Sequence, residues 1–573
     1  MARKKQGFLH GSIILMLSMA VVKLVGAYFK IRLTHILGGT GMGYFSSGYG
    51  LFGPVFALTA AGIPAAVAKL TAEFSARGEF QALRKLKRIA LLVSIGAGVV
   101  GTAIVFGFAR PFVDQVVHNP SAYFAVLAMA PGIFLCCVAA IYHGYFEGLR
   151  NMYPTAVSHI FESVVKALAG LLASQAVLEA ALRQFAAGGA VFGHTVHTLE
   201  QATAAALPYA SAAAVGGVTL SCLAEMGYLM LRLRLGGDGI TKREIASSPE
   251  APRKRVLLSR LVKLAVPVSI GAIVLNIASL VDLVTIMRRL GDAVREAPAY
   301  FLDRYGSALG EDGLAGLPNF LYGSYTGLAV TIFNFIPAIA GMFGKSALPN
   351  LTTAWAVGDK PAVAMNIRRV LRATALLAVP AGLGITALAR PILALLYQGR
   401  AAEIDAASAP LAVMGVCSIA LALVSPLFAM LQAVGRADIP VKIMTVGMVL
   451  KFAGNWWLVG IPGVDLMGAT IATTACYGFI LIGSFIALCH VTGVHPSLRK
   501  TFGKPLLAGA ACAVFAWAGN GLLVHVLDSA VRVLPAIAGG GVMYVAVLFA
   551  TGGVEWAEVT AILRRFGWGK AKE

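Results

Sequence analysis

The chain has 573 residues, of which 58% are hydrophobic and 13% are charged, and its formal net charge is +21. This composition excludes an ordinary soluble protein and predicts a polytopic membrane protein. A basic balance in such a protein reflects its orientation and the anionic lipid headgroups, so it does not indicate nucleic-acid binding.

Apolar stretches long enough to cross a bilayer as helices recur along the whole chain. A membrane-spanning helix needs roughly 20 mainly apolar residues, whereas a β-barrel strand would be shorter and would alternate in polarity. The pattern therefore predicts an all-α polytopic membrane protein with about fourteen transmembrane helices. They are expected at 9–33, 43–68, 89–109, 122–146, 154–174, 206–231, 261–287, 320–344, 370–388, 407–432, 439–459, 466–489, 505–526 and 533–550.

The distribution of Lys and Arg predicts the orientation of these helices. Roughly two thirds of the 47 basic residues fall in the two tails and in alternate connections, on one side of the membrane. This bias predicts that both termini lie in the cytoplasm. The first span follows Arg3, Lys4 and Lys5 without a small-residue cleavage site, which favours a retained helix over a signal peptide.

Basic residues inside the first span are its most informative feature. Lys23 and Lys30 lie about 20° apart around a helix, whereas Arg32 points nearly the opposite way. Inserting one basic residue at the centre of a membrane costs roughly 2.5–3.5 kcal/mol of free energy. Lys30 and Arg32 either bind substrate or extend to the headgroups, while Lys23 is too deep to do so and is expected to face a polar cavity. An anionic substrate such as a diphosphate would suit these cations.

Further charged residues lie within later spans. Glu162 and Lys166 are spaced for an i, i+4 ion pair, which fits a structural role as well as a substrate-binding one for Lys166. Asp282 is expected either to pair with Lys451 or to join Asn455 in offering oxygen ligands to a coupling cation. With Glu162 and Glu225, these residues form a predicted coupling or structural charge network.

The sequence predicts neither a metal site nor a bound cofactor. All seven cysteines lie in apolar spans, without CxxC or Cys/His metal spacing. No cytoplasmic connection contains the GxxxxGK[ST] pattern of a nucleotide-binding loop. Membrane potential, sodium ions or protons therefore remain as expected energy sources.

The chain contains an internal repeat. Residues 78–111, from Gly-Glu to Ala-Arg-Pro, resemble residues 358–391, from Gly-Asp to Ala-Arg-Pro, at an offset of about 280. Such repeats in membrane proteins are typical of transporters that bind substrate between two halves. The predicted organisation is two six-helix lobes (1–235 and 261–490) joined by a basic linker (236–260), then two extra helices (491–552) and an amphipathic cytoplasmic tail (553–573).

Several stretches resemble a known family. KLVGAYFKIRLTHILGGTGMGYFSSGYGLFGPVFALTAAGIPAAVAKLTAEFSARGE (23–79), IPAIAGMFGKSALPNL (336–351) and LQAVGRADIPVKIMTVGMVLKFAGNWWLVGIPGVDLMGATIATTACYG (431–478) are similar to the stage V sporulation protein B and polysaccharide-biosynthesis group. This group belongs to the multidrug/oligosaccharidyl-lipid/polysaccharide (MOP) exporters and is related to MurJ-type lipid II flippases. The resemblance implies a MATE/MurJ-like fold with a cationic cavity, to which Lys23, Lys30 and Arg32 correspond by position and charge.

The resemblance implies a flippase that moves an undecaprenyl-diphosphate-linked glycan, such as lipid II, to the outer leaflet of a bacterial cytoplasmic membrane, and that functions as a monomer. A cation-coupled drug antiporter and a membrane-embedded glycosyltransferase are alternative hypotheses. A non-transporting scaffold is a further one, but a scaffold has no reason to retain buried lysines. Residues 175–205, with His194 and His197, and residues 291–319 are expected to be outer loops.

Overall fold

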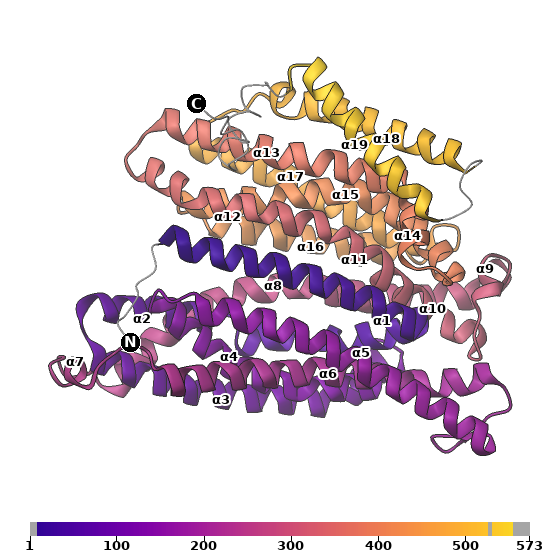
Figure 1. The fold of residues 1–573 in the computed structure, drawn as a ribbon, viewed down its shortest axis with the longest axis horizontal. Helices are drawn as coiled ribbons and strands as arrows, with labels where there is room; N and C mark the ends of the chain where they lie inside the picture. The colour runs from indigo at the N-terminus through magenta and orange to yellow at the C-terminus, as the bar shows by residue number, and fades with distance from the viewer. Residues whose placement is uncertain (1–7, 525–529, 554–573) are drawn as a thin grey trace, which may run out of the picture. The chain divides into compact units, whose positions relative to one another are not determined.

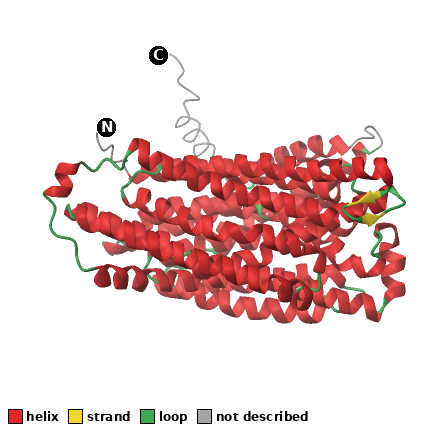
Figure 2. Ribbon diagram, turned by 90° about the horizontal axis from the view of Figure 1, so that it is seen from below, coloured by secondary structure: helices red, strands yellow, loops and turns green. Residues whose placement is uncertain are grey.

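The computed structural model describes residues 8–524 and 530–553, so the predicted tail lies outside the described residues from 554 onward. Almost all of the described chain is helical, with one small hairpin (Figure 2). In the hairpin, strand β1 (Ala190–Val191) pairs antiparallel with β2 (His194–Thr195). The α-helical class predicted from hydropathy is therefore confirmed.

Long apolar helices follow one another through the chain. They are α1 (Phe8–Thr59), α2 (Ile63–Arg77), α3 (Phe80–Pro111), α4 (Tyr123–Gly148), α5 (Tyr153–Gly188), α6 (Leu199–Gly236), α8 (Lys254–Glu296), α10 (Gly313–Ser324), α12 (Phe335–Ala356), α13 (Lys360–Ala387), α15 (Ala401–Ala433), α16 (Asp438–Leu458), α17 (Asp465–Thr492), α18 (Lys504–Leu523) and α19 (Val533–Ala550). Shorter elements are η1 (Phe112–Val116), η2 (Pro120–Ala122), α7 (Lys242–Ala246), α9 (Pro298–Tyr305), η3 (Gly306–Ala308), η4 (Tyr325–Ala329), α11 (Val330–Phe333), α14 (Ala389–Leu396), η5 (Arg499–Gly503) and η6 (Ala530–Arg532).

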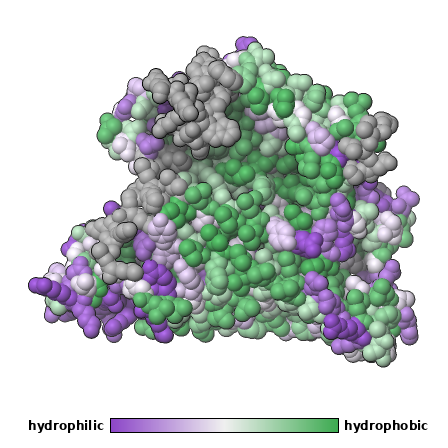
Figure 3. Space-filling view, in the orientation of Figure 1, coloured by the Kyte–Doolittle hydropathy of each residue, from purple (hydrophilic) through white to green (hydrophobic). Residues whose placement is uncertain are grey.

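Within the described residues, eleven helical stretches are long and apolar enough to cross a membrane. One of them, Ile14–Arg77, overlaps both of the first two predicted spans. Two more predicted spans fall on α8 and α16, which are long helices outside those eleven. The protein is thus a multi-pass membrane protein, and the number fourteen stays a prediction. Figure 3 shows hydrophobic residues along the helices and hydrophilic residues at their ends.

The chain packs into two compact units. One contains the residues up to Leu328 together with Phe452–Ala469, and the other contains Ala329–Lys451 and the residues from Thr470 onward. In the first unit, α3, α4, α5 and α6 lie side by side (Figure 1). In the second, α13 packs against α12, α15 and α18. The boundaries of these two units differ from those of the two predicted lobes. The division into lobes therefore stays a prediction.

The internal repeat is visible in the backbone. Gly78 and Gly358 both adopt left-handed conformations, with φ of 72° and 73°, just before α3 and α13. Only glycine enters this region at little steric cost. Each glycine therefore allows a sharp turn into a helix at corresponding positions of the repeat.

The polar connections are more ordered than a simple loop. In the basic linker, α7 begins at a capping box formed by Thr241 and Glu244. Arg84 on α3 contacts Asp238 of the linker at 3.1 Å. The two segments expected to be outer loops are also largely helical: α5 continues to Gly188, and α8 and α9 cover much of 291–319. His194 and His197 are exposed, as expected.

Candidate functional site

Helix α1 carries the three cations predicted to bind substrate. The helix is interrupted at Gly38, where φ is 63° and ψ is −172°. Gly39, the next residue, lies so close to α10 that an added Cβ would be 2.8 Å from a ring carbon of Phe320. The break therefore allows the second half of α1 to approach α10, while the first half carries the cations.

The three cations have different surroundings. The side chains of Lys23 and Arg32 are exposed and form no hydrogen bond or ion pair with the residues that the structure describes. Lys30 is partly buried, and its Nζ donates a hydrogen bond of 2.8 Å to the backbone oxygen of Thr326 in η4. Lys30 is thus directed into the protein and not toward the headgroups. Lys23 and Arg32 keep all their hydrogen-bonding capacity for other partners.

A second group of charges lies where α4, α5 and α6 meet. Lys166 and Glu162 on α5 are 3.8 Å apart, so the predicted i, i+4 pair is present. Glu225 on α6 is buried, and its Oε1 lies 3.1 Å from His143 Nε2 on α4 and 3.1 Å from His159 Nδ1 on α5. A carboxylate inside a membrane protein is expensive unless donors surround it, and the two imidazoles supply those donors.

Close packing of α5 on α6 sets this geometry. Gly217 on α6 lies against the backbone of Gly170 on α5 where the two helices cross, and a side chain on either glycine would strike its neighbours. Glu162 and Glu225 each lie eight residues from these glycines, Glu162 before Gly170 and Glu225 after Gly217. On antiparallel helices this spacing places both carboxylates about 12 Å from the crossing, toward the same end. The crossing therefore aligns the charged groups.

Sequence reasoning identified Glu225 but not His143 and His159. His159 precedes Glu162 by three residues, so it shares a face of α5 with that carboxylate. That spacing was the available signal for His159. His143 lies four residues before Glu147 on α4, so a spacing signal was available for it too, but only the packing of α4 against α6 brings it to Glu225.

Asp282 on α8 and Asn455 on α16 are in contact. Asn455 Nδ2 donates hydrogen bonds to Asp282 Oδ1 at 3.0 Å and to Thr285 Oγ1 at 2.9 Å. The amide therefore presents its nitrogen to the carboxylate, whereas the cation hypothesis expected its oxygen beside Asp282. Asn455 Oδ1 is buried without a hydrogen-bond partner among the described residues. Lys451, also on α16, is buried.

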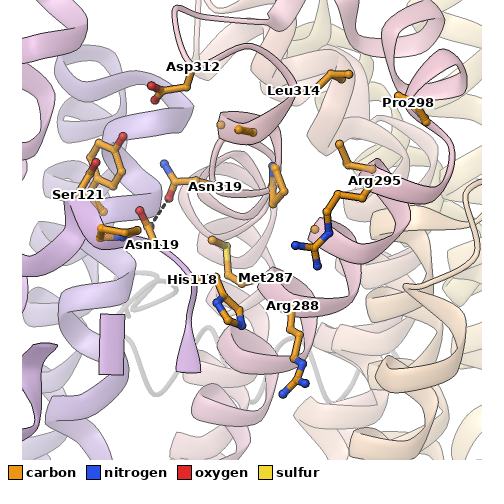
Figure 4. Close-up of a pocket in the computed structure, with 17 residues that line it drawn as sticks. His118, Asn119, Ser121, Met287, Arg288, Arg295, Pro298, Asp312, Leu314 and Asn319 are labelled. Atoms are coloured by element: carbon orange, nitrogen blue, oxygen red, sulfur yellow. Dashed lines mark hydrogen bonds between the residues drawn. The ribbon is translucent and has the colours of Figure 1, made fainter. Parts of the chain in front are cut away.

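A cavity of about 570 Å³ lies at one end of the first unit. Figure 4 shows Arg288 and Arg295 from α8 along one side of it. Arg295 forms an ion pair with Asp292, and Arg288 lies over the ring of Trp456 at 5.6 Å. Asn119 donates a hydrogen bond of 2.8 Å to Asn319 (Figure 4). Two guanidinium groups give this cavity the chemistry to bind an anionic group.

The chain is similar in sequence to known membrane proteins. The family model of the lipid II flippase MurJ matches residues 324–530. The chain is 23% identical over 561 residues to the lipid II flippase MurJ of Bacillus subtilis, with 94% of each chain covered. It is 28% identical over 162 residues to the stage V sporulation protein B of the same organism, which covers 28% of this chain and 31% of that protein.

Solved structures show the same fold. The lipid II flippase MurJ in an inward closed conformation aligns with a TM-score of 0.63 at 12% identity, covering 93% of this chain and 98% of that chain. An inward-facing multidrug resistance MATE transporter of the MOP superfamily aligns with a TM-score of 0.58 at 14% identity, covering 84% and 99%. The chain is therefore similar in sequence to the lipid II flippase MurJ and to stage V sporulation protein B, and it shares its fold with MurJ and with MATE transporters.

Proposed function

We propose that this protein is a flippase that moves a polyprenyl-diphosphate-linked glycan, lipid II or a related peptidoglycan precursor, from the inner to the outer leaflet of a bacterial cytoplasmic membrane. The observation that carries the proposal is that Lys23 and Arg32, on opposite faces of α1, are exposed and form no hydrogen bond or ion pair with the described residues. A helix retains such costly residues when a ligand supplies their partner. A diphosphate has the charge and the acceptor oxygens to do so.

In the proposed mechanism, the diphosphate binds at the α1 cations while the lipid tail stays in the bilayer. The protein then alternates between inward-open and outward-open states, as a monomer with both termini in the cytoplasm. An inside-negative potential drives an anionic headgroup outward, by roughly 2.3 kcal/mol per charge per 100 mV. Sodium ions or protons would provide further coupling without a nucleotide or another cofactor.

The test measures lipid II on the outer face of cells depleted of their own flippase. Wild-type protein, Lys23→Ala and a control, Lys69→Ala, are compared at equal membrane abundance. Lys69 is also an exposed lysine without a described partner, but it lies on α2. Lys30→Ala is a poorer test, because it also removes the hydrogen bond to Thr326.

We expect wild type and Lys69→Ala to restore outer-face lipid II, and Lys23→Ala to reduce its appearance at least tenfold. Equal activity of all three would contradict a substrate-binding role for Lys23. Failure of the well-inserted wild type would mean that lipid II is not the cargo. Other undecaprenyl-linked glycans would then be assayed, and drug efflux that depends on Asp282 would favour the antiporter.

A further inference from the structure

The cluster formed by His143, His159 and Glu225 is not explained by cargo binding. Its three side chains come from three helices of the first unit, and their ligand atoms all lie within 4.8 Å of one another. The side chains of His143 and Glu225 are only 12% and 7% exposed, whereas that of His159 is 28% exposed. The cluster is therefore largely enclosed, with access from one side through His159.

The charges around the cluster do not balance. Glu147 and Glu162 act electrostatically on the histidines together with Glu225, and Lys166 is the cation that pairs with this group. If all three carboxylates are ionised and both imidazoles are neutral, one lysine leaves a deficit of two positive charges. Within membrane-spanning helices, such a deficit is costly. Among the described residues, the other titratable groups that interact with this cluster are Tyr49 on α1, Cys136 on α4 and Cys222 on α6.

Two protons or one divalent cation would supply the missing charge, and the ring geometry favours protons. The rings of His143 and His159 are stacked, with centroids 4.6 Å apart and an angle of 17° between their planes. A metal ion binds in the plane of each imidazole at about 2.0–2.1 Å. Two nearly parallel, stacked rings cannot both meet that condition at one ion, whereas hydrogen bonds are longer and tolerate more misalignment, so both N–H groups can reach the shared Glu225 oxygen at 3.1 Å.

His143 has a nitrogen that is placed to accept a proton. When Nε2–H of His143 donates to Glu225, the neutral ring keeps a lone pair on Nδ1. That atom is buried and has no hydrogen-bond partner among the residues that the structure describes. Protonation at Nδ1 places a positive charge beside the carboxylate, and His159 is the member of the cluster that is most exposed to water.

A hydrogen bond connects α5, next to the cluster, with α1, next to Lys23. Ser163, which follows Glu162 on α5, lies 3.4 Å from the backbone oxygen of Val22 and donates a hydrogen bond to it. Val22 immediately precedes Lys23 on α1. A change in charge beside Glu162 therefore acts on the segment of α5 that packs against the proposed cargo-binding residue.

We propose that His143, His159 and Glu225 form a proton-binding site, loaded with up to two protons on the histidines, whose occupancy is coupled to transport. Each proton comes from bulk water, binds an imidazole lone pair and returns to water when the site reopens. The coupling half of this proposal rests on the proposed flippase function, whereas proton binding does not. Two coupled protons would shift the transport equilibrium about 100-fold for a gradient of one pH unit.

The first measurement is a pH titration of histidine side chains by ¹⁵N nuclear magnetic resonance, with the full chain in lipid nanodiscs. His143→Gln and His159→Gln assign the signals, and His194→Gln is the control, since His194 is exposed on β2. We expect His143 and His159 to titrate as a coupled pair, and Glu225→Gln to separate them by at least one pH unit. If Glu225→Gln does not fold, His143→Gln should leave His159 with a single, uncoupled titration.

Independent titration of both histidines at the ordinary value of about 6.5, unchanged in Glu225→Gln, would overturn the site. So would stoichiometric binding of Zn²⁺ that shifts both signals and depends on Glu225. The second measurement compares lipid II flipping in proteoliposomes at about pH 6 and about pH 8. We expect at least a tenfold rate ratio in wild type and His194→Gln, and a ratio near one in His159→Gln. Flipping that does not depend on pH would overturn the coupling, whereas absence of flipping with intact titration would contradict only the flippase function.

Discussion

Replacement of Gly217 by alanine tests the helix crossing that aligns the charge network. An ideal Cβ on Gly217 would lie 2.5 Å from Gly170 Cα and 2.8 Å from the carbonyl carbon of Ala169 on α5. Carbon atoms in contact are normally about 3.5–4.0 Å apart, so α5 and α6 would have to separate by about 1 Å. The neighbouring Gly216 offers a matched control, because a Cβ there meets nothing within 4 Å.

The expected difference in stability between the two variants follows from these distances. Overpacking of a close interface costs roughly 1–3 kcal/mol, and the obstacle here is backbone that has no alternative rotamer. Glycine to alanine at an open helix position instead stabilises by roughly 0.5–1 kcal/mol. Because alanine favours the helix equally at both positions, we expect Gly217→Ala to be less stable than Gly216→Ala by about 1–3 kcal/mol.

The assay is thermal unfolding of the full chain in detergent, followed with a thiol-reactive dye. Six of the seven free cysteines are buried, so labelling reports unfolding. Because unfolding of such a protein is commonly irreversible, apparent Tm values are compared at a single scan rate. We expect the apparent Tm to be highest for Gly216→Ala, intermediate for wild type and lowest for Gly217→Ala. Equal Tm values, or a higher value for Gly217→Ala, would refute the close crossing.

Two further predictions concern polar contacts in the same unit. Asn455→Leu removes both hydrogen bonds to Asp282 and Thr285, so unfolding should become easier by roughly 1–3 kcal/mol; an unchanged Tm would contradict the contact. Tyr305, whose hydroxyl donates to Asp465 Oδ2 at 3.2 Å, has its pKa raised above the ordinary 10.0 by burial and by the charge of Asp465. The protonated hydroxyl of Tyr305 therefore stabilises the folded state fully below pH 10, and this stabilisation is lost as the pH rises toward the pKa of Tyr305 in the folded state. Wild type should lose Tm above pH 10 more steeply than Tyr305→Phe, and parallel curves would show that Tyr305 does not contribute.

The sequence alone predicted what depends on short-range patterns. Hydropathy located the helices, because crossing a bilayer requires a long apolar stretch regardless of its neighbours. The i, i+4 spacing predicted the ion pair of Glu162 and Lys166, since one helix face brings these residues together. The repeat predicted corresponding turns, and the structure shows left-handed glycines at Gly78 and Gly358.

Polar segments between spans were less predictable. Residues 175–205 and 291–319 were expected to be outer loops, yet they extend or form helices. Hydropathy marks where lipid begins and ends, but a helix can continue into water when its backbone hydrogen bonds and side-chain contacts are retained. The sequence signal for a membrane boundary is therefore not a signal for the end of a helix.

Only the tertiary structure decided which distant residues meet. It directs Lys30 to the backbone of Thr326 and turns the nitrogen of Asn455, not its oxygen, toward Asp282. It also brings His143 and His159 to Glu225. Periodicity assigns each residue to a face of its own helix, but the partner across that face depends on how neighbouring helices cross. Here the small residues at the crossing of α5 and α6 fix that distance and register, and with them the charges that the two helices share.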